Sequence, residues 1–508
     1  MTIREIREGD IEAVIQLFRK NYGDDYAIPE FYDPQWVKRG IYSDHIIWLV
    51  NEEDARIVAS GACILNFGDY NDQIGEIGRL VVDPDVMGHG LGQSMLTALV
   101  DASDEQVEFA FAEARTVHPK TQKIDDHIGL VALGFLPMYY LMAWRESLVL
   151  SGQLFGNGRT LRRPGSAEVI PAVAPLAKLS LRNLQLDEPV TVRDNARPYP
   201  LDQSAAVEPL TGASLVRLLR IEQGRVVEPE MFGGMHIDEG LSQLRTRKAE
   251  YLVASDGDRT LGAVGYVHDE HNRSVRLTEL IALDEGVKGG LLRLAVDEAE
   301  RRYEADIVKC DVSATSPRLQ QTLYAMGFLP AAYVPGMVFH QTARWDVVRM
   351  IKLNVPWDPG HLELTEPSQE YADLVVPAFQ QASAARERRR LALNVHLLNG
   401  LIPLEFEFLQ HVCTETSPPA GLALSADALH MVLAGTVAAG GHRLGVGDFT
   451  GVGGLLGSAP AEAAVAGDGA HILSLGAAGL AQLSDQHPRL AIKLYQNLVA
   501  QRGPSERA

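Results

Sequence analysis

The segment with the most chemical content is EIGRLVVDPDVMGHGLG, residues 76–92. An apolar strand pattern runs here into a glycine-rich turn, and the turn opens a segment with helical periodicity. The glycines at 88, 90 and 92 let the main chain approach a ligand closely, and the first amides of a helix attract anions. The turn therefore predicts a site for a pyrophosphate group. Such turns also occur without a ligand, so the assignment depends on the surrounding elements.

A carboxylate, Glu76, lies on the strand that leads into this turn. A carboxylate close to a bound ligand can act as a general base, which removes a proton from the group that reacts. Glu76 is a candidate for that base, acting directly or through water. Its alternative role is structural, as an ion-pair partner of Arg79 or as a charge at a solvent-facing edge. The sequence leaves both roles open.

The elements that must position these residues form a mixed α/β pattern. The run IEAVIQLF, residues 11–18, predicts an amphipathic helix, and a second helix is expected directly after the glycine turn. Alternating and apolar runs predict strands at residues 2–7, 45–51, 57–67, 76–82 and 107–114. This order predicts an α/β (α+β) fold class with a mixed sheet for residues 1–150.

The same order of elements recurs in residues 189–345. It begins near Val190 and continues with a helix at 214–223, strands at 249–255, 261–269 and 275–283, a helix at 291–303 and a strand at 306–312. The segments 118–122 and 316–320 share the form x-P-basic-x-Q, in which the proline suits the start of a helix. Their offset is 198 residues (316 minus 118). We therefore predict two copies of one fold, connected by a linker with one helix at 151–188.

Two further regions follow. Residues 346–400 have a helical, charged pattern and predict a connector. Residues 401–508 combine short apolar runs with closely spaced glycine turns and end in an amphipathic helix. This pattern predicts a small β-roll with a closing helix.

Composition excludes several classes of function. The 46 basic and 66 acidic residues give a net charge of −20, and RERRR at 386–390 is the only dense basic run, so nucleic acid is not an expected partner. The three cysteines are far apart and predict buried free thiols, with neither a disulfide framework nor a metal site. No segment reaches the length of a membrane span, and the N-terminus lacks the layout of a signal peptide. We expect a cytoplasmic protein without a metal or a membrane partner.

Residues 1–150 resemble the GNAT (GCN5-related) N-acetyltransferases. That family has a strand, then V-x-P, then [RQ]-x-x-G-x-[GA] at the start of a helix, and residues 82–84 and 87–92 fill this pattern. Met87 departs from it, because the family usually has Arg or Gln there. Downstream, His118 falls where the family often has Asn, and Asp125 stands where it usually has Tyr.

The resemblance implies that acetyl-CoA is the co-substrate. The pyrophosphate would be held by the turn, while backbone groups of the preceding strand would pair with the pantetheine arm and polarise the thioester carbonyl. The residues implied in binding are Leu80, Val81, Val82, Met87, Gly88, His89, Gly90, Leu91, Gly92 and His118. The resemblance also places Glu76 where the family often has its general base. The usual proton donor, a Tyr, is missing, and the acid stays unassigned among Asp125, His127 and Tyr140.

The later regions resemble known families without their ligand-binding residues. In the second copy the corresponding turn carries Asp284 and Glu285, which would repel a pyrophosphate, so we expect it not to bind acetyl-CoA well. The last unit resembles a cyclic-nucleotide-binding domain. Val452 stands at the position of that family's ribose-binding Glu, and Ala461 at that of its phosphate-binding Arg. The charge-assisted contacts would be lost, which predicts a degenerate domain.

The function expected from the sequence is transfer of an acetyl group from acetyl-CoA to a primary amine of a small molecule, by direct attack. Two alternatives stay open. One is a protein-lysine acetyltransferase with a regulatory C-terminal domain, and the other is a non-catalytic sensor or scaffold. The acceptor, the acyl chain length, homodimer formation and any ligand of the C-terminal domain are not determined by the sequence.

Overall fold

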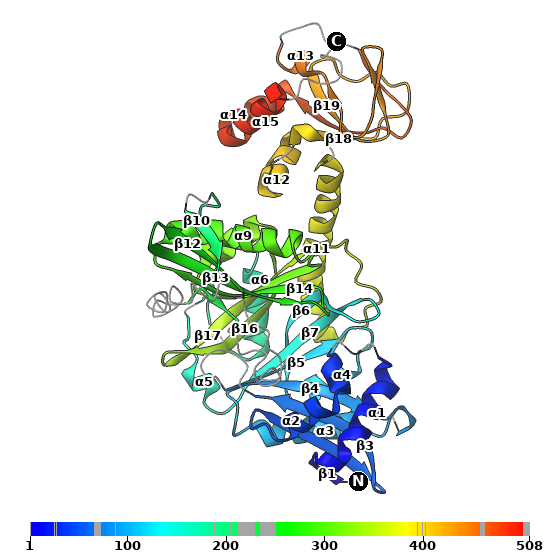
Figure 1. Cartoon of the computed structure of the whole chain (residues 1–508), viewed down its shortest axis with the longest axis vertical. Helices are drawn as coiled ribbons and strands as arrows, with labels where there is room; N and C mark the ends of the chain where they lie inside the picture. Colours follow the sequence, from blue (N-terminus) through cyan, green and yellow to red (C-terminus); the bar gives the residue numbers. More distant parts are fainter. Residues whose placement is uncertain are drawn as a thin grey trace. The chain divides into compact units, whose positions relative to one another are not determined.

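The structure is a computed structural model of the 508-residue chain (Figure 1). It describes residues 2–24, 26, 28–65, 73–86, 88–165, 167–186, 188–202, 205–210, 229–233, 250–393, 395–398, 400–401, 403–457 and 463–500. The helix expected at 214–223, together with Met87 and Ala461, lies outside the described residues.

The chain divides into two compact units. The first comprises residues 1–324 and 328–379, and the second comprises residues 325–327 and 380–508. Helix α11 (Glu366–Leu393) contributes residues to both units.

The first half of unit 1 matches the predicted order closely. Its helices are α1 (Ile11–Tyr22), α2 (Pro34–Ile41), α3 (Leu91–Ser103) and α4 (Lys120–His127). Its strands are β1 (Thr2–Glu5), β2 (Ile46–Glu53), β3 (Arg56–Ile64), β4 (Ile74–Val82), β5 (Phe109–Arg115), β6 (Val131–Leu141) and β7 (Arg145–Leu154). The mixed α/β class predicted from the sequence is confirmed.

Alternating side chains of these strands build two cores, one on each face of the sheet. Trp48 and Val50 of β2 pack with Phe18 of α1 on one face. Leu49, which points the other way, packs with Leu96 of α3. Burying both faces explains why β2 to β4 are mostly apolar instead of strictly alternating.

The second half of unit 1 contains a comparable series of elements (Figure 1). The helices are α9 (Lys288–Arg301) and α10 (Pro317–Ala325). The strands are β10 (Ala206–Pro209), β11 (Met231–Phe232), β12 (Glu250–Asp256), β13 (Arg259–Asp269), β14 (Ser274–Ala282), β15 (Ile307–Ser313), β16 (Leu329–His340) and β17 (Ala343–Leu353).

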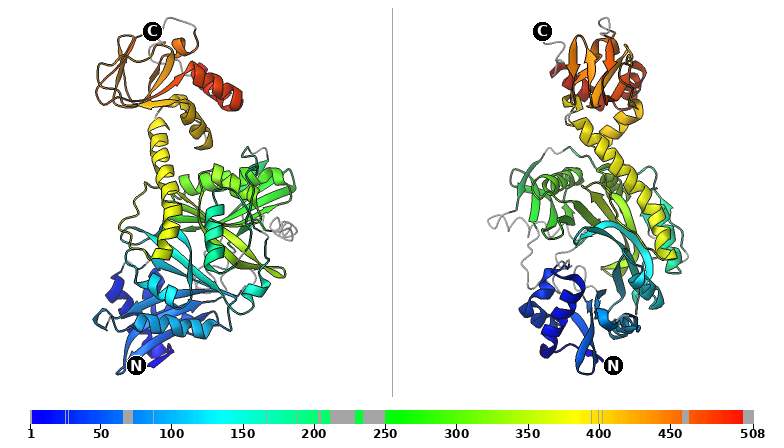
Figure 2. Two further views of the ribbon diagram at one scale, coloured as in Figure 1. Left: turned by 180° about the vertical axis from the view of Figure 1, so that it is seen from behind. Right: turned by 90° about the vertical axis from the view of Figure 1, so that its right-hand side faces the viewer.

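In the described part of the chain, fifteen strands of both halves form one sheet. The order β3-β4-β5-β7-β6 in the first half is followed by β16-β17-β15-β14-β13 in the second, so the same order runs in the opposite sense. Strands β6 and β16 pair where Gly134 faces Ala332. A Cβ on Gly134 would lie 2.2 Å from the Ala332 Cβ, so only glycine permits this approach. Figure 2 shows the blue and cyan first half curving into the green second half.

Buried polar contacts also join the two halves. Arg344, which is fully buried, pairs with Glu108 at 2.8 Å, and Arg145 pairs with Asp306 at 3.0 Å. The Asn272 side chain accepts a hydrogen bond from the Leu141 amide at 2.7 Å. Breaking such a buried pair leaves an uncompensated charge, so these contacts hold the halves in one arrangement.

Three details differ from the predicted segments. Thr191–Val192 form β9, which pairs with β8 (Glu168–Val169) outside the large sheet, and β10 is the first strand of the second half in that sheet. Residues 346–353, predicted to belong to a helical connector, form most of β17. The predicted boundary at residue 150 falls within β7. Strand pairing with distant residues decides all three, and a local pattern does not contain that information.

The segment between the two halves contains α5 (Gly158–Leu161) and α6 (Ala174–Asn183). Helix α6 packs against both β6 and β16. The Ser180 hydroxyl of α6 makes a hydrogen bond of 3.3 Å to the Leu133 carbonyl oxygen. The helix therefore covers the junction of the two halves.

Unit 2 contains two small antiparallel sheets, with strand orders β18-β24-β19-β22 and β21-β20-β23. Their strands are β18 (Thr414–Thr416), β19 (Ala428–Ala434), β20 (Val437–Ala439), β21 (His442–Leu444), β22 (Phe449–Thr450), β23 (Ala464–Ala466) and β24 (His471–Gly476). The helices are α12 (Pro403–Val412), α13 (Val452–Leu455), α14 (Ala477–Gln486) and α15 (Pro488–Ala500). A leucine-rich core joins the first sheet to the helices.

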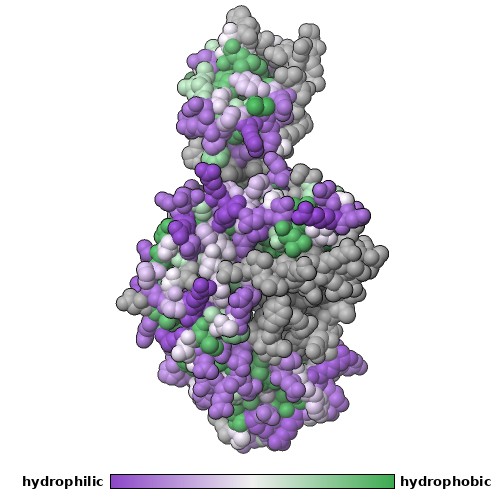
Figure 3. Space-filling view, turned by 90° about the vertical axis from the view of Figure 1, so that its left-hand side faces the viewer, coloured by the Kyte–Doolittle hydropathy of each residue, from purple (hydrophilic) through white to green (hydrophobic). Residues whose placement is uncertain are grey.

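The described surface agrees with the acidic, polar composition. Figure 3 shows a face on which hydrophilic residues predominate and hydrophobic areas are small and scattered. None of the helices in the described ranges is long and apolar enough to cross a membrane. All three cysteines are free thiols; Cys63 and Cys310 are buried as predicted, and Cys413 is partly buried.

Candidate active site

The candidate site begins where two parallel strands separate. Strands β4 and β5 pair only at Ile74 with Phe109, Gly75 with Ala110 and Glu76 with Phe111. Beyond Glu76, β4 continues to Val82 paired with β3, which is its one neighbour among the described residues, while β5 continues along β7. The strands therefore form a fork, and Glu76 lies at its base. The backbone of Leu80 to Val82 lies on the open arm of this fork.

A β-bulge shapes the open arm. Ala62 of β3 pairs with Gly78 and Ser60 pairs with Val81, so Arg79 and Leu80 together oppose one residue. Arg79 has a φ of 53°, which a residue with a Cβ rarely adopts. Bulges of this kind bend a strand and redirect its side chains and amides. The bulge turns the Arg79 guanidinium back toward Glu76, with an N–O distance of 2.8 Å.

Glu76 is 6% exposed and shares its surroundings with several charges. Burial raises its pKa to about 7, and the nearby Glu113 adds to this effect, whereas Arg79, Arg276 and Arg349 oppose it. A carboxyl group that titrates near neutral pH has the proton affinity that suits a general base. The structural contact with Arg79 is also present, so the geometry accommodates both roles considered for Glu76.

The glycine-rich turn lies at the far end of β4. Gly88 and Gly90 have φ values of 94° and 75°, and Gly88, His89 and Gly90 are all exposed. The first amides of a helix have no partner within it, so α3 presents its N-terminal N–H groups at this turn. An exposed turn with these properties suits a pyrophosphate.

Two residues fix the start of α3 against the fork. Leu91, the first residue of α3, is 3% exposed and so is a buried hydrophobic residue. A Cβ on Gly92 would lie 3.4 Å from the side chains of both Leu80 and Ile124. The helix therefore lies close to both β4 and α4, which keeps the turn beside the open arm.

The residues around α4 differ in accessibility. The buried Nδ1 atom of His118 has no hydrogen-bond partner in the described part of the chain, which leaves it available to a ligand. Asp125 is fully buried, and burial raises its pKa well above the usual value. His127 is exposed, and the Tyr140 hydroxyl donates to Glu113 at 2.7 Å. None of the three acid candidates is singled out by this arrangement.

The second half contributes charged residues that sequence reasoning missed. Arg349 of β17 pairs with Asp311 of β15 at 2.8 Å and reaches Glu113 of the first half at 3.3 Å. Arg276 of β14 lies 3.7 Å from Asp311, and its guanidinium donates to the Tyr139 hydroxyl at 3.2 Å. The sequence did contain a sign of this cluster. Each of these charged residues interrupts an otherwise apolar strand, as Glu76 does.

The turn that precedes α9 in the second half is arranged differently. The Asp284 side chain accepts the Gly286 amide at 2.8 Å, and Lys288 pairs with Glu230 at 2.6 Å. A Cβ on Gly289 would lie 2.2 Å from the Pro200 carbonyl oxygen, because that segment covers the helix start. At the start of α9, protein groups therefore fill the space that is open to solvent at the start of α3.

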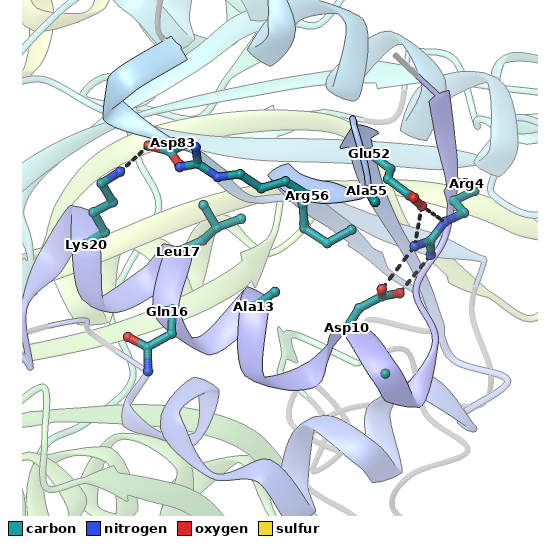
Figure 4. Close-up of a pocket in the computed structure, with 12 residues that line it drawn as sticks. Arg4, Asp10, Ala13, Gln16, Leu17, Lys20, Glu52, Ala55, Arg56 and Asp83 are labelled. Carbon is teal, nitrogen blue, oxygen red and sulfur yellow. Dashed lines mark hydrogen bonds and ion pairs between the residues drawn. The ribbon is translucent and has the colours of Figure 1, made fainter.

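A separate groove with a volume of about 440 Å³ lies between α1 and the β2–β3 hairpin (Figure 4). Its charged side chains already have partners. Lys20 and Arg56 pair with Asp83, and Arg4 pairs with Asp10 and with Glu52. The Asp83 carboxylate also accepts a hydrogen bond from the backbone amide of Asp85. The ion pairs that line the groove therefore help to fix the backbone just before the glycine turn.

Residues 11–122 match the model of the acetyltransferase (GNAT) family. The chain therefore carries a GNAT-family N-acetyltransferase domain. No curated protein matches the sequence significantly. Among the described residues, no group of three or more His, Cys, Asp or Glu side chains is arranged to hold a metal ion.

Solved structures of GNAT enzymes resemble parts of the chain. A ribosomal-protein-alanine N-acetyltransferase from Brucella melitensis is 17% identical, with 30% of this chain and 100% of that chain covered and a TM-score of 0.28. A variant of spermidine N-acetyltransferase from Vibrio cholerae is 15% identical, with coverage of 30% and 92% and a TM-score of 0.27. A GCN5-related N-acetyltransferase from Kribbella flavida is 15% identical, with coverage of 59% and 61% and a TM-score of 0.34.

Proposed function

We propose that the chain transfers an acetyl group from acetyl-CoA to a primary amine of a small molecule. The observation that carries the proposal is the fork between β4 and β5, with Glu76 at its base and the glycine turn at its mouth. The two features lie at opposite ends of one strand arm, as a long thioester substrate requires. The orphaned His118 Nδ1 adds a polar group for such a substrate.

The residues proposed to hold acetyl-CoA are those on the open arm and the turn. Gly88 to Gly92 would surround the pyrophosphate with amides, and Leu80 to Val82 would pair with the pantetheine arm as a neighbouring strand would. The co-substrate supplies the activated acetyl group. A backbone amide of the arm would stabilise the charge that develops on the thioester oxygen during attack.

Glu76 is proposed to accept the proton of the acceptor amine, directly or through water. Its raised pKa makes the carboxylate basic enough to act near neutral pH, while Arg79 stabilises the ionised form at 2.8 Å. Direct attack needs no nucleophilic side chain. The group that protonates the departing thiolate is left unassigned among Asp125, His127 and Tyr140.

A small acceptor fits this site better than a lysine on a protein surface. Glu76 is 6% exposed, and charges from the second half lie near it. We propose that residues 189–345 are a degenerate second GNAT-like fold that limits access to the fork. We further propose that the Asp284 turn holds no acetyl-CoA, because the Asp284 carboxylate already accepts a hydrogen bond from the Gly286 amide.

For the C-terminal unit we propose a degenerate cyclic-nucleotide-binding-like domain. Val452, at the position of the family's Glu, packs against the hydrophobic core and offers no carboxylate to a ribose. Titration with cyclic AMP is expected to show no binding at physiological concentrations. A dissociation constant in the low micromolar range would contradict this proposal.

The proposed function is tested by incubating the full chain with acetyl-CoA and a panel of primary amines. Release of CoA and an acetylated product, detected by mass spectrometry, is the expected result. Binding of acetyl-CoA without transfer to any amine would favour the sensor alternative. Acetylation of protein lysines at higher kcat/KM than any small amine would favour the protein-lysine alternative.

A further inference from the structure

A buried lysine lies near the fork, and among the described residues it has no acidic partner. Lys309 of β15 is 8% exposed, and its Nζ atom lies 4.1 Å from the centre of the Tyr139 ring and 6.0 Å from that of Tyr140. In the described ranges, no carboxylate oxygen lies within 4.0 Å of it, which is the limit for an ion pair. Aromatic faces stabilise a cation only weakly compared with a carboxylate.

The nearby carboxylates are already engaged. Both oxygens of Asp311 are bound by Arg349, at 2.8 and 3.0 Å. Glu113 accepts from Arg349 at 3.3 Å and from Tyr140 at 2.7 Å. Among the described residues, the Lys309 ammonium is therefore left in contact with the rings of Tyr139 and Tyr140.

The charges around Lys309 and Glu76 belong to one cluster. Arg276 is the register partner of Lys309 on β14, and both Lys309 and Glu76 have their pKa values shifted by Arg276, Arg349 and Glu113. Asp269 also acts on Lys309 and raises its pKa. Burial is the largest cause of the lowered pKa of Lys309, and Arg276 and Arg349 lower it further, so an anion bound next to the ammonium would stabilise its charged form.

We propose that Lys309, next to Arg276, binds a carboxylate of the acceptor, so that the acceptor is an amine that also bears a carboxylate. The inference rests on the proposed function and deepens it by naming the substrate class. A carboxylate at Lys309 receives the charge-assisted hydrogen bonds that the protein does not supply. The amine of the same molecule is then held on the side of Glu76.

The site has a defined pH dependence. Burial lowers the pKa of Lys309 to about 7, so the unoccupied site is mostly neutral at pH 8 and mostly charged at pH 6. A bound carboxylate favours the charged form and raises that pKa. Binding at pH 8 therefore takes up a proton, whereas binding at pH 6 does not.

The first test compares matched pairs of acceptors in which one member has a carboxylate and the other has none, such as tyrosine and tyramine, or histidine and histamine. In the pairs that react, the member with the extra carboxylate is expected to have a kcat/KM about tenfold higher or more, a difference of about 1.4 kcal/mol. The ratio is expected to fall to about 1 in Lys309→Met, which keeps the length of the side chain. Lys352→Met is the control, because Lys352 already pairs with Glu300.

An unchanged ratio in Lys309→Met, or a preference for the decarboxylated member in the unaltered enzyme, overturns the inference. Absence of acetyl transfer to every amine counts against the proposed function instead. In that case, the succinate-binding experiment alone tests whether Lys309 forms an anion site.

The second test is calorimetry with succinate, which has no amine. At pH 8, in buffers of different ionisation enthalpy, the unaltered chain is expected to bind succinate with uptake of close to one proton, and at pH 6 with almost none. Lys309→Met is expected to lose the binding, and Lys352→Met to keep it. Equal binding by Lys309→Met, binding at pH 8 without proton uptake, or no binding by the unaltered chain overturns the inference.

Discussion

The two strand-to-helix turns of unit 1 have similar settings and opposite chemistry. In the first half, Gly88 and Gly90 leave the start of α3 open and exposed. In the second half, the Asp284 carboxylate accepts a hydrogen bond from the Gly286 amide, and the backbone at Pro200 covers the start of α9. Strand order and helix position are alike in both, so the backbone scaffold alone does not make a phosphate site. A few residues at the turn decide it.

The glutamates on the corresponding strands, β4 and β14, also differ in their surroundings. Glu76 at the base of the first fork is 6% exposed, and its pKa is raised to about 7 by burial. Glu279, on β14 of the second half, accepts a hydrogen bond from the Tyr251 hydroxyl at 2.9 Å. The second half also directs Arg276, Lys309 and Arg349 toward the first fork's cluster. We interpret the second half as a contributor to one site and the first as the place of reaction.

The largest effect is expected from closing the first turn. Gly90→Asp adds a side chain at a φ of 75° and a negative charge where the pyrophosphate would lie, so binding of CoA is expected to be lost. Calorimetry should show one CoA per unaltered chain and none for the variant. Gly257→Asp is the control, since Gly257 has a φ of 54° in a turn of the second half. Two equivalent sites, or full binding by Gly90→Asp, would contradict the comparison.

The next effect concerns the two glutamates. Glu76→Gln is expected to lower kcat/KM by roughly 10²- to 10⁴-fold, the range for loss of a general base, with little change in acetyl-CoA affinity. Glu279→Gln should leave the rate nearly unchanged. Because Glu76 also pairs with the buried Arg79, the free energy of unfolding of Glu76→Gln is measured in parallel, which separates a loss of stability from a loss of the base.

The pH profile separates catalysis from structure at Glu76. A base must be deprotonated, so the rate of the unaltered enzyme is expected to rise with pH through about 7 and then level off. In Glu76→Gln this rise should be absent or moved toward the pKa of the free amine. A variant that keeps its rate and its profile would show that Glu76 serves only as the partner of Arg79.

The sequence predicted the local elements of the first half better than the contacts between the two halves. The helix at 11–18, the strands up to residue 114 and the glycine turn follow from local periodicity and turn chemistry. The pairing of β6 with β16 and the cluster around Arg349 depend on residues more than 190 positions apart, as in the ion pair of Arg349 with Glu113. No local pattern carries such contacts. The charges that interrupt apolar strands were the one available signal.

A moderate effect is expected at the contacts that join the halves. Arg344 donates to the Gly336 and Met337 carbonyls at 2.7 Å and pairs with Glu108. Arg344→Met should lower the free energy of unfolding by about 3 kcal/mol, since it leaves buried acceptors without a donor. The exposed pair of Arg318 with Glu285 is the control, and Arg318→Met should cost less than about 1 kcal/mol.

Urea denaturation measures both variants, and hydrogen exchange shows where protection is lost. Protection in Arg344→Met is expected to fall in β5 and in β16 together, because Glu108 directly precedes β5 while Gly336 and Met337 lie on β16. Loss confined to one half would show that the two halves are energetically independent.

The smallest effect is expected at the second turn. Asp284→Asn removes a negative charge from the start of α9 but keeps an oxygen that can accept the Gly286 amide. If charge alone kept acetyl-CoA away, the variant would gain a second, weaker site. The Pro200 carbonyl next to Gly289 and the pair of Lys288 with Glu230 still fill the place of a pyrophosphate, so the stoichiometry should stay at one and the affinity should change less than about twofold. Calorimetry with acetyl-CoA measures both. A stoichiometry of two would show that the second half retains a latent site blocked by one carboxylate, and that the two turns differ by far less than their geometry indicates.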